Sequence, residues 1–173
     1  MIEKNRIAAE AADLLKELRK VQVLHIAGPM GLLFFIGTIL FVYFSVVQTV
    51  QPNTISFLGF IQVASLINLV VFLCGLAISH RVIQSVLEPA PGTIVSVSRL
   101  RNRIILRLFI LEFVAFFGSI VTLLAVVFAT VRVNPVYWLN LCPAAVFIYI
   151  VINKFPTQQF FNEVIHGAQP ASS

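Results

Sequence analysis

The sequence has very little charge, and that charge is unevenly placed. Charged residues make up 11% of the 173 residues, whereas a typical soluble domain contains about 25%. No Asp, Glu, Lys or Arg occurs from residue 26 to residue 79, and only Glu112 and Arg132 are charged between residues 108 and 153. A bilayer crossing needs about 20 apolar residues, so each stretch is long enough for two crossings. The lack of charge therefore excludes an ordinary soluble domain.

Signatures of catalysis and metal binding are also missing. The two cysteines, Cys74 and Cys142, lie inside apolar stretches and form no CxxC motif, and His25, His80 and His166 form no pair at ligand spacing. The sequence has no phosphate-binding loop, no nucleophile elbow and no pair of carboxylates within an apolar stretch. We therefore expect no metal, no cofactor and no enzymatic activity.

Turn-forming residues interrupt both apolar stretches. The first stretch contains Gln51-Pro52-Asn53-Thr54 and the second contains Val133-Asn134-Pro135. The sequence therefore predicts an all-α integral membrane protein, a four-helix bundle of two tandem helical hairpins preceded by an N-terminal amphipathic helix. The predicted spans cover about 30–50, 57–79, the membrane part of a long helix over 99–131, and 136–155.

This pattern divides the chain into five segments. We expect a cytoplasmic amphipathic helix at 1–25, a first transmembrane hairpin at 26–80 and a basic cytoplasmic loop at 81–103, in which 93–98 is extended. A second hairpin follows at 104–155, and a disordered cytoplasmic tail at 156–173. Residues 28–29 (Gly-Pro) allow a bend into the first span.

The basic residues predict the orientation. Lys and Arg exceed Asp and Glu by five, and every Lys or Arg except Arg132 lies before residue 26, between residues 80 and 107, or at Lys154. Positive residues that flank spans stay in the cytoplasm. Both termini and the central basic segment should therefore be cytoplasmic, and membrane topology rather than nucleic-acid binding explains the charge. Small size and short loops lead us to expect a bacterial inner membrane.

The predicted amphipathic helix carries one narrow apolar stripe. Ile7, Leu14 and Leu18 recur at helical spacing, and the polar face holds nearly equal numbers of acids and bases. A helix that lies flat on a membrane is usually richer in Lys and Arg. We favour docking of these three residues against a protein surface, either the chain's own bundle or a partner, over binding to headgroups.

The two hairpins resemble each other. When the chain is shifted by 81 residues, eleven of 37 consecutive pairs are identical, and residues 35–39 fall on residues 116–120. This similarity predicts a duplicated hairpin whose halves are related by an axis along the membrane normal. The matched Gly37 and Gly118 are expected at close helix contacts, because small residues let helices approach.

Glu112 is the only acid within a predicted span, and intramembrane acids are candidate functional sites. One interpretation is a structural ion pair, with Arg81 or Lys154 as partner, or a hydrogen-bonded acid. The other is a carboxylate that handles protons or cations. Gln62 and Asn68 would extend it into a polar seam, which is either interhelical hydrogen bonding or a polar pathway. The other members of that seam are Thr38, Gln48, Ser65, Ser119, Thr122 and Asn140.

Four arginines cluster before the third span. Arg99, Arg103 and Arg107 recur every four residues, and Arg101 lies beside them. They are either a topology signal with snorkelling side chains or a site for anionic lipid or an acidic partner.

The function most consistent with these features is a non-enzymatic subunit or accessory protein of a membrane complex, which contacts the bilayer and other membrane or cytoplasmic protein subunits. The first alternative is an oligomeric channel or a proton- or cation-coupled transporter that uses Glu112, for which a closed homo-oligomeric ring is needed. A membrane-embedded enzyme is the less favoured alternative.

Overall fold

The computed structural model describes residues 2–45, 55–87 and 96–160, and within these residues it is all-helical without any strand. Four helices are long and apolar enough to cross a membrane, which confirms this part of the prediction and indicates a multi-pass membrane protein. The elements are α1 (Ile2–Ser45), α2 (Ile55–Leu87), α3 (Val97–Val127), α4 (Thr130–Val133), the 3-10 helix η1 (Pro135–Leu141) and α5 (Cys142–Asn153).

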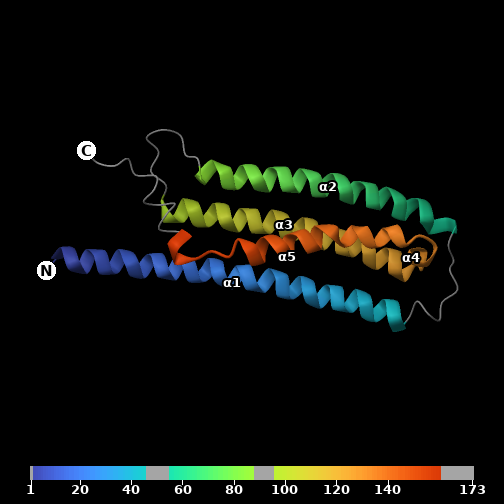
Figure 1. Cartoon of the computed structure of the whole chain (residues 1–173), viewed down its shortest axis with the longest axis horizontal. Helices are drawn as coiled ribbons and strands as arrows, with labels where there is room; N and C mark the ends of the chain where they lie inside the picture. Colours follow the sequence, from blue (N-terminus) through green and yellow to red (C-terminus); the bar gives the residue numbers. More distant parts are fainter. Residues whose placement is uncertain (1, 46–54, 88–95, 161–173) are drawn as a thin grey trace.

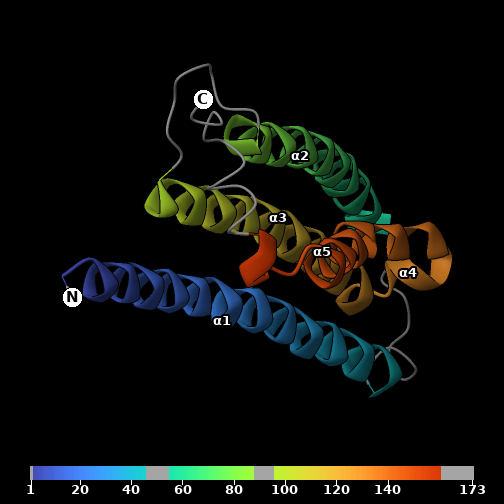
Figure 2. The same ribbon diagram turned by 60° about the vertical axis from the view of Figure 1, so that its left-hand side comes forward.

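Helix α3 is the centre of the arrangement. It contacts α1, α2 and α5, whereas α1 and α2 have almost no contact with each other. Both ribbon views place α1 and α2 on opposite sides of α3 (Figures 1 and 2). The first two spans are therefore consecutive in sequence without packing on each other as a closed hairpin would.

The outer surface is apolar. Phe34, Phe41 and Ile152 are 80%, 69% and 70% exposed, and many other large apolar side chains are exposed with them. In water this surface would form contiguous apolar patches far larger than monomeric soluble proteins show. Lipid tails are the environment that such a surface fits.

Helix α1 runs without interruption through the expected boundary at residues 25–26. Pro29 lies inside it and, having no N–H, cannot donate the usual helix hydrogen bond. Transmembrane helices tolerate such prolines because neighbouring groups satisfy the freed backbone. The expected amphipathic helix is thus the first part of a 44-residue helix rather than a separate element.

Most of the expected basic loop is helical. Helix α2 continues to Leu87, and α3 begins at Val97 after Ser96, whose hydroxyl caps the helix by accepting a hydrogen bond from the backbone N–H of Arg99 at 3.3 Å. Val97 and Ser98 are therefore not extended, because the serine cap starts the helix there. Ser96 is extended as expected, with φ −80° and ψ 150°, and the rest of the expected extended segment, residues 93–95, lies outside the described residues.

The third and fourth spans also differ from expectation. Helix α3 ends at Val127 rather than near residue 131, and Ala129 has a left-handed backbone with φ 54°. A left-handed residue cannot continue a right-handed helix. The expected fourth span begins as the 3-10 helix η1, and Pro143 lies in the first turn of α5, where no N–H is needed.

Two buried clusters fill the interior. One lies toward the end that holds the start of α1, the end of α2, the start of α3 and the end of α5, which we term the basic end; the other lies toward the opposite end. At the basic end Pro156 is buried and Phe160 packs against the cluster. The expected disordered tail is thus packed over its first residues, and residues 161–173 lie outside the described part of the chain.

Candidate functional site

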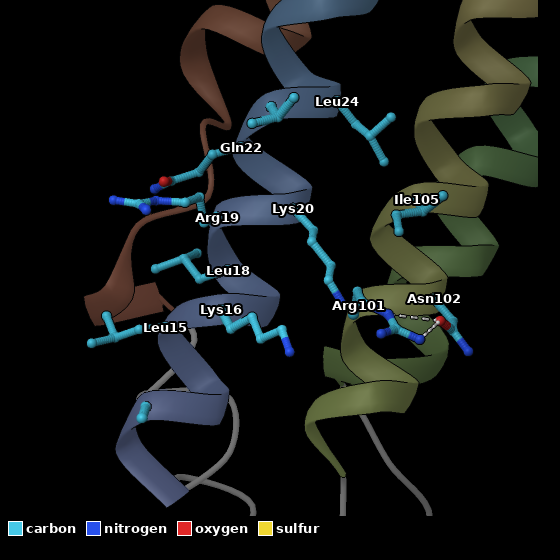
Figure 3. Close-up of a pocket in the computed structure, with 12 residues that line it drawn as sticks. Leu15, Lys16, Leu18, Arg19, Lys20, Gln22, Leu24, Arg101, Asn102 and Ile105 are labelled. Atoms are coloured by element: carbon cyan, nitrogen blue, oxygen red, sulfur yellow. Dashed lines mark hydrogen bonds between the residues drawn. The ribbon is translucent and has the colours of Figure 1, made fainter. Parts of the chain in front are cut away.

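A groove of about 1130 Å³ lies at the basic end, beside residues 12–24 of α1 and residues 101–105 of α3. Figure 3 shows its side chains, which come from both helices. We term it the basic groove, and it is lined by Ala12, Leu15, Lys16, Leu18, Arg19, Lys20, Gln22, Val23, Leu24, Arg101, Asn102 and Ile105.

Positive charge dominates the basic groove. Lys16 and Lys20 point from α1 toward Arg101 on α3, whereas Arg19 points away from α3 (Figure 3). Glu17 bonds Arg101 across the two helices and also contacts Lys20, with 2.7 Å between the Lys20 ammonium and the Glu17 carboxylate. Among the side chains that the structure describes, Glu17 is the one acid at this site, so an excess of positive charge remains.

The expected docking residues on α1 do not all face outward. Leu18 is 5% exposed and belongs to the chain's own buried cluster, and Leu14 is half-buried. Leu18 therefore docks on the chain's own bundle, which is one of the two surfaces that we expected, and is not available to a partner. The side chain of Ile7 lies outside the described part. The apolar side chains that α1 leaves exposed at the groove are Leu15, Val23 and Leu24.

The four arginines separate into different environments. Arg101 lies in the basic groove, Arg99 and Arg103 are exposed, and Arg107 is partly buried on the side of α3 that faces another cavity. The sequence predicted a single cluster because the four arginines are close together along the chain. The helix turns them toward different neighbours.

Glu112 faces α1. A Cβ placed on Gly28 would lie 3.2 Å from the Glu112 carboxyl carbon, so the absence of a side chain at Gly28 makes room for the acid. Within the part of the chain that the structure describes, the carboxylate has no ion pair. The pairing with Arg81 or Lys154 that one interpretation of the sequence predicted is therefore not present there. It lines a shallow groove of about 250 Å³ between α1 and α3.

The expected polar seam is split. Asn68 donates to the Asn140 side-chain oxygen at 3.0 Å, and Asn140 donates to the Ser65 hydroxyl at 2.9 Å, so these residues link α2 to η1. Gln62 and Thr38, in contrast, are exposed. Ser119 and Thr122 are buried, but their hydroxyls donate to backbone carbonyls of their own helix. Gln48 lies outside the described residues.

Glu112 and this asparagine cluster do not share a path within one chain. Gly118 contacts the cluster, because a Cβ there would lie 3.1 Å from the Asn68 side-chain oxygen. Glu112 precedes Gly118 by six residues, which corresponds to about 240° around a helix of 3.6 residues per turn. The acid and the asparagines therefore lie on different faces of α3.

The two matched glycines differ in their surroundings. A Cβ on Gly118 would lie 2.2 Å from the backbone oxygen of Asn140, a distance that no structure tolerates, whereas a Cβ on Gly37 would meet nothing within 4 Å. Close helix approach is thus present at Gly118 and absent at Gly37. Gly75, which the sequence did not single out, is a second close approach, because a Cβ placed on it would lie 2.5 Å from a methyl group of Val114.

Sequence reasoning missed three features of these sites. The Glu17–Arg101 bridge joins residues far apart in sequence, and Gly28 makes room for Glu112. The third is a cavity that brings His25 and His80 together with Arg107. The only available signal was the presence of opposite charges at the starts of α1 and α3, which does not specify a pair.

Comparisons with known proteins add no identification. The chain matches no family model, no curated protein and no solved structure.

Where the structure describes the chain, no three His, Cys, Asp or Glu side chains come together as a metal site requires.

Proposed function

We propose that this protein is a non-enzymatic subunit or accessory protein of a membrane complex, and that it binds an acidic helical segment of a partner protein in the basic groove. The observation that carries the proposal is the composition of that groove. Lys16, Lys20 and Arg101 supply cations from two helices, beside the exposed apolar side chains of Leu15 and Leu24. An amphipathic helix with acidic flanks complements both features, since apolar anchors supply affinity and charge sets orientation.

The proposed orientation puts the basic groove in the cytoplasm. All Lys and Arg residues except Arg132 lie at or near the basic end of the chain or in the segments that flank it, and the positive-inside rule assigns that end to the cytoplasm. Both termini are then cytoplasmic. We assign the protein to a bacterial inner membrane on its small size and short connections.

The proposal includes a four-helix bundle that arose by duplication of a hairpin. Phe35 and Phe116, which are equivalent in the 81-residue repeat, contact each other with ring centroids 5.8 Å apart. An axis along the membrane normal brings equivalent residues together where it passes between α1 and α3. The halves nevertheless pack differently, because α3 contacts α5 and α1 scarcely contacts α2.

The alternative of an oligomeric channel or transporter has less support. Glu112 faces α1, and the Asn68–Asn140 cluster lies on another face of α3 with its amide groups bonded to each other. A polar path would require a ring of copies that brings Glu112 residues together. We therefore keep Glu112 as a test residue rather than as the proposed site.

Site-specific photo-crosslinking tests the proposed function. A photoreactive residue at Asn102 lies in the basic groove, and one at Gln62 is exposed on the apolar surface, which makes it the matched control. In native membranes the Asn102 probe should give one discrete polypeptide adduct, and the Gln62 probe should give lipid adducts only. Adducts of lipid alone at both positions would contradict the proposal.

Charge removal provides a second readout. The double substitution Lys16→Gln and Lys20→Gln should lower the yield of the Asn102 adduct at least tenfold, because the groove loses two positive charges. Arg81→Gln and Arg103→Gln remove exposed cations that do not line the groove and should leave the yield unchanged. Equal losses for both double variants would indicate a general charge effect and contradict recognition by the groove.

A further inference from the structure

A second cavity lies inside the basic end, separate from the basic groove. It has a volume of about 370 Å³ and is formed by α1, α2, α3 and the segment that ends α5. Its lining is mostly basic and apolar, and Asn153 adds one uncharged polar side chain. The basic members are His25, His80, Arg107 and Lys154.

Among the described residues of the lining, no acid balances the basic side chains. The four basic side chains come from four different segments. The Nε of Arg107 is buried without a hydrogen-bond partner. His25 is 4% exposed, and its Nδ1 makes no hydrogen bond of standard geometry, although the ring lies close to the backbone of Val21 and Lys154. Buried polar groups without partners are costly and are rarely retained. An anion in the cavity would provide acceptors for both.

Most of the rest of the wall is aliphatic, together with Asn153, Phe155, Pro156 and Phe160. Ile83, Leu87, Ile104, Leu108, Leu111 and Ile150 line the same space. A free inorganic anion gains nothing from such a wall, whereas a ligand with both an anionic head and a hydrocarbon chain would contact every part of it.

The depth of the cavity fits a lipid headgroup. Helix α3 continues for twenty residues from Arg107 to its end at Val127, which is about 30 Å at 1.5 Å per residue. That length matches the hydrocarbon core of a bilayer, about 30 Å. A crossing by this stretch of α3 would put Arg107 and Lys154 at the edge of the hydrocarbon core, within reach of the phosphate groups.

We propose that this cavity binds the phosphate group of an anionic phospholipid, with Arg107 and Lys154 as the charged contacts and His25 as a buried donor. The acyl chain leaves along the aliphatic wall toward the bilayer core. This site is independent of the basic groove, so its test and the test of the partner proposal can fail separately.

The test measures lipid binding to the full-length chain. Native mass spectrometry in neutral detergent compares phosphatidylglycerol with phosphatidylcholine of the same acyl chains, and glycerol 3-phosphate serves as the soluble anion. One phosphatidylglycerol per chain should bind at least tenfold more tightly than phosphatidylcholine, and glycerol 3-phosphate should not displace it at equal concentration. Equal binding of the two lipids would overturn the proposal. Displacement by glycerol 3-phosphate would overturn the assignment to a lipid.

Variants locate the site. Lys154→Gln and His80→Gln alter exposed members of the lining, so folding should be unaffected. Lys154→Gln should weaken phosphatidylglycerol binding about fivefold, as expected for loss of one charge near a membrane surface. Arg107→Gln should weaken it more, and Arg103→Gln, which is exposed and not in the lining, should not. An equal loss in Arg103→Gln would show that only the general charge of the surface matters and would overturn the proposal.

Acids of the chain itself are tested as competitors for the cavity. Glu88 and Glu163 follow Leu87 and Phe160 closely in sequence, and both of the latter residues line the cavity. If the double substitution Glu88→Gln and Glu163→Gln leaves the preference for phosphatidylglycerol unchanged, the proposal stands. If the wild-type chain has no preference and the double variant acquires one, the cavity is neutralised from within and the proposal is wrong.

Discussion

Helices α1 and α3 share matched sequence segments but occupy different positions. In the most apolar window of each helix, half of the α3 residues are buried inside the protein, compared with 11% in α1. Residues 35–39 of α1 and 116–120 of α3 are the matched segments. Apolar content therefore determines whether a helix crosses a membrane, whereas small residues and polar side chains determine which helix becomes central.

The largest expected effect distinguishes the two matched glycines. Gly118→Ala should lower the free energy of unfolding by about 1–3 kcal/mol or more, as overpacking of a filled interior does, because the new methyl group would overlap the Asn140 backbone oxygen. Gly37→Ala should leave stability unchanged or slightly raised. SDS-induced unfolding of the purified protein measures both. Equal effects of the two substitutions would refute the central position of α3.

The asparagine cluster should give the next largest effect. Asn68→Leu removes the bond to Asn140 and should cost about 0.6–2 kcal/mol, the range for interhelical hydrogen bonds in membranes. Gln62→Leu, on the same helix, is the control, because Gln62 is exposed and its replacement adds apolar surface. If Gln62→Leu lowers stability as much as Asn68→Leu, the buried polar contact is not specific to the face of α2 that carries Asn68, and this prediction is wrong.

The contact between Gly28 and Glu112 should have a smaller effect. Gly28→Ala brings a methyl group to 3.2 Å from a flexible carboxyl group, so we expect a loss of less than about 1 kcal/mol. Glu112→Ala should relieve this crowding, so the double variant should be more stable than the sum of the two single effects predicts. Additive effects in this double-mutant cycle would mean that the two residues do not touch.

The smallest expected effect on stability is that of Glu17→Gln. Glu17 bridges the exposed Lys20 and the partly buried Arg101, and ion pairs that solvent still reaches contribute little to stability. The SDS unfolding midpoint should not change measurably. The yield of the Asn102 cross-link should rise, because the groove becomes more positive. A fall in that yield would show that Glu17 contacts the partner directly.

The spans could be predicted from sequence because charge is excluded from hydrocarbon regardless of what surrounds a helix. The absence of charge between residues 26 and 79 therefore located two of them, and the breaks near Pro52 and Pro135 separated neighbouring spans. Helix ends were predicted less well. The left-handed residue after α3, for example, is Ala129. A glycine or proline at that position would have marked the end of the helix in the sequence.

The candidate site could be predicted only in part, because it depends on how helices face each other. The four arginines were recognised as a cluster, but the rotation of α3 separates Arg101 in the basic groove from Arg107 in the second cavity. In the same way Leu18 satisfied the docking pattern and proved to be buried against the chain's own helices. Periodicity identifies a face, and only the fold identifies what the face contacts.

Membrane topology tests the central claim most directly, because both proposed sites require the basic end on a single side of the bilayer. Reporters fused after Gln51 and after Gly92 would lie between the first and second spans and between the second and third. The account predicts that they are accessible from opposite compartments, with the Gly92 reporter in the cytoplasm. Accessibility of both reporters from the same compartment would contradict it.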